Sequence, residues 1–142
     1  MTYTTKDALI ERYGLRRLVE LTDTVPPYTQ QVQDGVLARA IIKTDALIDA
    51  HLVGRYALPL AVVPPLLADI AATLVYAALH VDQITDLAKA DADEARKLLA
   101  GVASGDLGLP GATALTTAAA NTTMVFSGGP PRRLGRDALD VL

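Results

Sequence analysis

The sequence predicts a small all-α protein, a bundle of four to five helices followed by an extended C-terminal arm. Its 142 residues include 24 alanines and 22 leucines, a bias that favours helices over strands. Hydrophobic residues make up 51% of the chain, which argues against disorder throughout it. Aromatic residues make up only 4%, so the expected core is aliphatic.

Two short helices are expected at the start of the chain. Thr5 is a suitable N-cap for a helix over 6–13, which Gly14 would end. A second helix is predicted over 15–21. The prolines at 26 and 27 then indicate a loop.

A longer helix is predicted from Asp34 to about Tyr56. One apolar stripe of this helix consists of Leu37, Ile41, Ile48 and Leu52. Two further side chains, Leu47 and His51, lie beside the stripe. Asp45 and Asp49 fall outside the stripe. We expect them on a solvated face, because two carboxylates are too few ligands for a metal site.

The next helix, predicted over 65–80, is apolar almost all round. Its proline lies in the first turn, where a missing N–H costs nothing. Such a helix is buried on most sides, and a subunit interface is one way to supply part of that burial. It is short of the roughly 20 apolar residues that a membrane span needs, so no membrane contact is expected.

The last helix is predicted to begin at Thr85 or Asp86 and to run to Ser104, with Gly105 as its stop. Its expected apolar face consists of Leu87, Leu98, Leu99 and Val102. Asp93 and Lys97 are spaced as an ion pair on its outer side. We therefore divide the chain into a helical core, 1–105, and an arm, 106–142, that a partner would order.

The composition also limits the function. The chain has no cysteine and two histidines, which excludes thiolate chemistry and a His-rich metal site. It contains neither a GxSxG nucleophile elbow nor a phosphate-binding glycine loop. We expect no enzyme activity, no cofactor and no catalytic or metal-binding residue. The N-terminus is too polar for a signal peptide, so synthesis in the cytoplasm is expected.

The C-terminal arm has the composition of a protein-binding segment. Three arginines lie within five residues, at 132, 133 and 136, directly after two prolines. Leucines at 134, 139 and 142 supply apolar anchors. Arginine combined with apolar anchors is typical of protein interfaces.

Four groups of residues resemble a known family. They read DALIERYG with LVELTD (7–14, 18–23), IDAHLVGRYALPL with VPPLL (48–60, 63–67), LLAGVASG (98–105) and RRLGRDAL (132–139). The pattern is similar to that of small virion proteins of Mu-like and other long-tailed phages that act as head-to-tail adaptors. The sequence departs from that pattern at Leu134 and Gly135, where relatives tend to carry Phe and Thr or Ser.

The resemblance implies a helical bundle that assembles with itself into a ring, about 12 copies matching the portal, in the neck of the virion. Its implied partners are the portal, a tail-side neck or tail-terminator protein, and DNA that only passes through the channel. The side chains expected to contact the portal are Arg132, Arg133, Leu134, Arg136, Asp137, Leu139 and Leu142. Those expected in subunit packing are Arg55, Tyr56, Leu58 and Leu60. Those expected to line the channel are Asp91, Asp93 and Glu94.

A different class of function is the alternative. Gly14 joins two short helices, and Arg12, Arg16 and Arg17 lie close to this turn. That arrangement is compatible with a small helix-turn-helix-like DNA-binding regulator. The net charge of −3 argues against it, because domains that bind DNA are usually basic.

Overall fold

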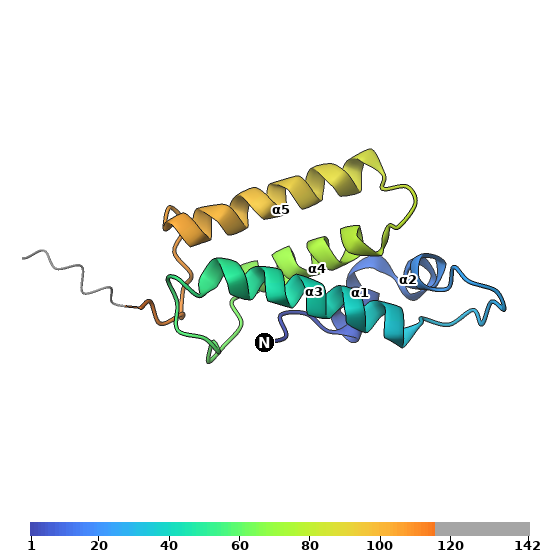
Figure 1. Ribbon diagram of the computed structural model, residues 1–142, viewed down its shortest axis with the longest axis horizontal. Helices are drawn as coiled ribbons and strands as arrows, with labels where there is room; N and C mark the ends of the chain where they lie inside the picture. Colours follow the sequence, from blue (N-terminus) through green and yellow to red (C-terminus); the bar gives the residue numbers. More distant parts are fainter. Residues whose placement is uncertain (116–142) are drawn as a thin grey trace, which may run out of the picture.

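The computed structural model describes residues 1–115, and these form five helices (Figure 1). They are α1 (Lys6–Tyr13), α2 (Leu15–Thr22), α3 (Asp34–Leu52), α4 (Pro65–Leu79) and α5 (Asp86–Ser104). Within the described residues the only β-pairing is an isolated antiparallel bridge between Tyr56 and Ala114. The all-α class is therefore confirmed.

The predicted capping residues set the helix ends. The Thr5 hydroxyl accepts a hydrogen bond from the N–H of Ala8, and the Thr85 hydroxyl accepts one from Ala88, each at 3.3 Å. Gly105 ends α5 in a left-handed conformation, with φ of 94°. These contacts satisfy backbone groups that a helix end leaves without partners.

Helix α3 is shorter than predicted. It ends at Leu52, and the expected continuation to Tyr56 is wrong. Turns over 53–55 follow, and Tyr56 instead pairs with Ala114. A glycine at 54 favours this ending, because glycine weakens a helix interior.

Helix α4 is the centre of the bundle, in contact with α1, α3 and α5 (Figure 1). Eight of its residues are buried, among them Leu67, Ile70 and Val75. Neighbouring helices of the same chain therefore supply the burial that its all-round apolar sequence demands.

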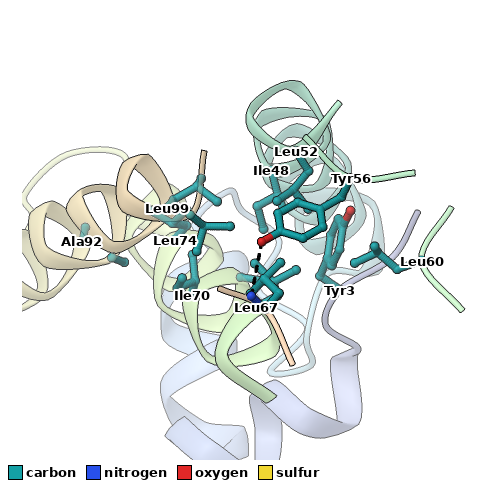
Figure 2. Close-up of a cluster of buried hydrophobic side chains, with 14 of the residues drawn as sticks. Tyr3, Ile48, Leu52, Tyr56, Leu60, Leu67, Ile70, Leu74, Ala92 and Leu99 are labelled. Atoms are coloured by element: carbon teal, nitrogen blue, oxygen red, sulfur yellow. Dashed lines mark hydrogen bonds between the residues drawn. The ribbon is translucent and has the colours of Figure 1, made fainter. Parts of the chain in front are cut away.

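The core has two clusters. One lies among α3, α4 and α5 and contains Ile48, Leu67 and Leu99 (Figure 2). The other joins α1 and α2 to α3 and α4 through Leu9, Leu18 and other buried residues. The short N-terminal helices are thus held by tertiary packing, since helices of eight residues are marginal alone.

Two expected core positions are wrong. Leu47 is 40% exposed and Leu87 is 73% exposed. By spacing, Leu87 belongs to the apolar face of α5 and Leu47 lies beside the stripe of α3, but no neighbouring element covers either side chain fully. Likewise, Asp93 pairs with Arg96, at 2.9 Å, rather than with the expected Lys97.

Candidate functional site

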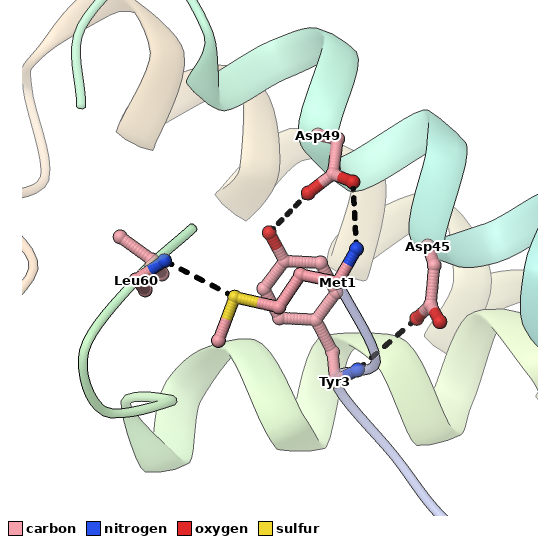
Figure 3. Close-up of polar contacts among 5 residues, drawn as sticks. All are labelled: Met1, Tyr3, Asp45, Asp49 and Leu60. Carbon is pink, nitrogen blue, oxygen red and sulfur yellow. Dashed lines mark hydrogen bonds and ion pairs between the residues drawn. The ribbon is translucent and has the colours of Figure 1, made fainter. Parts of the chain in front are cut away.

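The N-terminus forms a polar cluster on α3 (Figure 3). The terminal ammonium of Met1 pairs with Asp49 at 3.2 Å. The hydroxyl of the buried Tyr3 also donates to Asp49, and the backbone N–H of Tyr3 donates to Asp45 at 3.1 Å. The sulfur of Met1 accepts a hydrogen bond from the N–H of Leu60 at 3.2 Å. This cluster joins the N-terminus, α3 and the loop before α4.

The expectation that Asp45 and Asp49 are solvated is therefore wrong. Asp45 is only 7% exposed, and Asp49 is half-buried. Burial raises the pKa of Asp45, an effect that its hydrogen bond from Tyr3 partly opposes. Burial, together with the hydrogen bond to Asp49, also raises the pKa of Tyr3. Helical spacing alone showed no sign of the N-terminal segment that covers these carboxylates.

The four residues expected in subunit packing lie in different surroundings. Tyr56 and Leu60 are buried in the α3–α4–α5 cluster of their own chain, and Leu58 is half-buried against it. The Tyr56 hydroxyl accepts a hydrogen bond from the N–H of Leu109 at 3.2 Å. Arg55 is the exposed member of the set. Three of the four side chains thus stabilise the subunit itself.

Arg55 contacts the C-terminal end of α5. Its guanidinium donates to the carbonyl oxygen of Ser104 at 3.3 Å. It also lies against Gly105, where an added Cβ would collide with the guanidinium. The positive φ favours glycine at this position, whereas the guanidinium, at the end of a flexible side chain, can move aside. The Arg55 side chain therefore joins the turn after α3 to the turn after α5.

The chain after α5 returns to the same place. The carbonyl oxygen of Arg55 accepts from the N–H of Leu115 at 2.7 Å, and the N–H of Ala57 donates to Thr113 at 3.1 Å. Leu109 is buried in the core. The segment 106–115 is thus fixed beside residues 55–57, and the chain continues from this end of the bundle.

The residues expected to contact the portal lie outside the described part of the chain. They are Arg132, Arg133, Leu134, Arg136, Asp137, Leu139 and Leu142. The described part of the chain ends at Leu115, next to Arg55.

The three acidic residues expected to line a channel are exposed on α5: Asp91, Asp93 and Glu94. Asp91 and Glu94 border a hollow that α5 forms with α1 and α4. Asp93 pairs with Arg96 on a different flank of the helix. The structure therefore brings only Asp91 and Glu94 to one surface.

The arginines of the DNA-binding alternative each contact an acceptor. Arg12 pairs with Asp69 at 2.7 Å, and Arg16 pairs with Glu20 at 3.3 Å. Arg17 donates to the hydroxyl of Tyr76 at 3.1 Å, a hydrogen bond that raises its pKa. Their charges are thus partly committed to contacts within the chain.

Over residues 1–115, no three His, Asp or Glu side chains gather closely enough to hold a metal ion. In the same range, every helix is too short or too polar to cross a bilayer.

These features define a class of protein: a small all-α bundle whose polar contacts join the N-terminal segment to α3 and residues 113–115 to residues 55–57. Residues 3–127 match the model of the family described as Bacteriophage Mu, Gp36, and the chain belongs to that family. It is also 31% identical over 107 residues to the Mu-like prophage FluMu protein gp36 of Haemophilus influenzae. That match spans 75% of this chain and 74% of the relative.

Proposed function

We propose that the protein is a structural head-to-tail adaptor of a tailed phage. Copies form a ring under the portal, link the capsid to the tail and continue the DNA channel. Membership of the Mu Gp36 family, over residues 3–127, is the observation that carries this proposal. The resemblance of residues 7–23, 48–67, 98–105 and 132–139 to phage adaptor proteins supports the specific role.

The geometry suits the task. An adaptor subunit needs a rigid body and a segment that reaches its neighbour. Here the body has two apolar clusters around α4, and hydrogen bonds between 55–57 and 113–115 fix the point where the chain leaves it. Residues beyond that point carry the arginines and leucines proposed to contact the portal. The ring, the copy number of 12 and the tail-side partner belong to the same proposal.

Truncation of the arm tests the proposal. Deleting 128–142 should abolish binding to the portal in a pull-down while the helical circular dichroism of the subunit stays unchanged, because the five helices of residues 1–115 end by Ser104. A matched control replaces Arg132, Arg133 and Arg136 with Lys, which keeps the charge but loses the planar guanidinium. Portal binding that survives the deletion would contradict the proposed role of the arm.

The DNA-binding alternative predicts a different result. A gel shift of duplex DNA at low salt would support it, since phosphate contacts are strongest there. The adaptor proposal predicts no such shift.

A further inference from the structure

A groove runs between α3 and α5, with α4 as its floor. It encloses about 450 Å³. Its apolar lining includes Leu47, Leu74 and Ile84, and two of these, Leu47 and Ile84, are 40% and 38% exposed. Small residues such as Ala46 keep the groove open. These side chains offer a surface against which an apolar side chain of a partner would be removed from water.

The charges at this groove have one sign. Lys43 of α3 and Arg96 of α5 line it, and no acidic residue does. Within residues 1–115, Lys43 forms no ion pair. Arg96 pairs with Asp93, but both side chains are more than half exposed, and such pairs exchange partners at little cost. The groove therefore suits an occupant with apolar and acidic side chains.

The same chain presents that combination on another flank of α5. Leu87, Asp91 and Glu94 follow one another at helical spacing and are all exposed. This ridge lies toward α1, where Asp91 and Glu94 border one hollow and Leu87 borders another. Over the described residues neither acid has an ion-pair partner. Leu87, at 73% exposed, is the apolar side chain that would insert.

We propose that the α3–α5 groove of one copy receives the Leu87–Asp91–Glu94 ridge of a second copy. Leu87 lies against Leu47 and Ile84, and the two acids face Lys43 and Arg96. The inference rests on the proposed function, whose ring it supplies with an interface. It also gives Asp91 and Glu94 a role between subunits instead of on the channel wall.

The two surfaces lie on different flanks of α5, which suits a head-to-tail assembly. The groove opens on the α3 side of α5, whereas the ridge faces α1. One subunit can therefore use both surfaces at once, with a different neighbour on each. Such head-to-tail contacts close into a ring when the rotation per subunit divides a full turn. A two-fold dimer would instead make both contacts, groove to ridge and ridge to groove, between the same two copies.

Disulfide mapping tests this interface directly, because the chain has no native cysteine. Ala46→Cys marks the groove and Leu87→Cys marks the ridge; both positions are exposed. The two variants are mixed, oxidised with a copper catalyst and oxygen, and analysed by mass spectrometry, which separates mixed from like dimers. Val62→Cys, exposed in the loop before α4, replaces Ala46→Cys in the control mixture and measures random collision.

The expected result is that the Ala46→Cys and Leu87→Cys mixture forms mixed dimers several-fold faster than the control mixture or either variant alone. Adding Lys43→Glu to the groove variant should slow this reaction, and adding Glu94→Lys to the ridge variant should restore it. Mixed dimers no faster than the control would overturn the proposal. Fastest cross-linking of Leu87→Cys with itself would also overturn it, in favour of a two-fold dimer.

Failure here is distinguishable from failure of the adaptor role. The cross-linking uses the free protein, whereas the adaptor role is measured in phage particles. A protein present beside the portal but without this cross-link would retain its proposed function and lose only this interface.

Discussion

The hydroxyl of Tyr56 fixes the segment that leads into the C-terminal arm, so Tyr56→Phe should loosen that segment. Tyr56 is 4% exposed, and its hydroxyl accepts a hydrogen bond from the N–H of Leu109 at 3.2 Å. Without the hydroxyl this buried N–H has no partner, which costs about 1–3 kcal/mol. The phenyl ring still fills the core, so no cavity term adds to this cost.

Urea unfolding and amide hydrogen exchange measure the effect. The free energy of unfolding should fall by about 1–3 kcal/mol, and the Leu109 amide should exchange faster. Tyr28→Phe is the matched control, since Tyr28 is 65% exposed and should change stability by less than about 0.5 kcal/mol. Equal stabilities for the two variants, with an unchanged Leu109 amide, would refute this role for Tyr56.

Further substitutions test other contacts. Ile48→Ala should lower the free energy of unfolding by about 2–5 kcal/mol, because Ile48 is fully buried. Leu47 is 40% exposed, so Leu47→Ala should lower it by less than about 1 kcal/mol. Equal losses would contradict the described core. Gly105→Ala should lower the free energy of unfolding by about 1–2 kcal/mol through its positive φ, and further by displacing the Arg55 guanidinium. In an Arg55→Ala background only the loss caused by the positive φ should remain. Additive effects of these two changes in thermal unfolding would argue against their contact. Burial raises the pKa of Asp45, so the folded state binds a proton at this carboxyl more tightly than the unfolded state does. The stability of the wild type relative to Asp45→Asn should therefore rise as the pH falls from 7 toward the ordinary pKa of about 4. A pH-independent difference would contradict that burial.

Features set by neighbouring residues were predictable from the sequence. The helix ends at Thr5, Thr85 and Gly105 were predictable, because a capping residue contacts backbone only three or four residues away. Gly54 was a local sign of the early end of α3, but the bridge that Tyr56 forms with Ala114, far along the chain, was not predictable. A pairing of this kind leaves no periodic signal.

The surface features depended even more on distant contacts. Asp45 was misjudged because the residues that cover it come from the N-terminus. Leu47 and Leu87 follow helical spacing, yet spacing gives only the relative face and not which face another element covers. The exposed leucines are the side chains that the proposed interface uses, so the errors in the predicted core mark the candidate surface.

The most direct test of the adaptor role is to count this protein against the portal in purified particles of the phage that produces it. Quantitative mass spectrometry gives the ratio. The adaptor role predicts a ratio near one to one, as expected for a ring that matches the portal. Absence of the protein from the particle would contradict the account and direct attention to a role inside the infected cell.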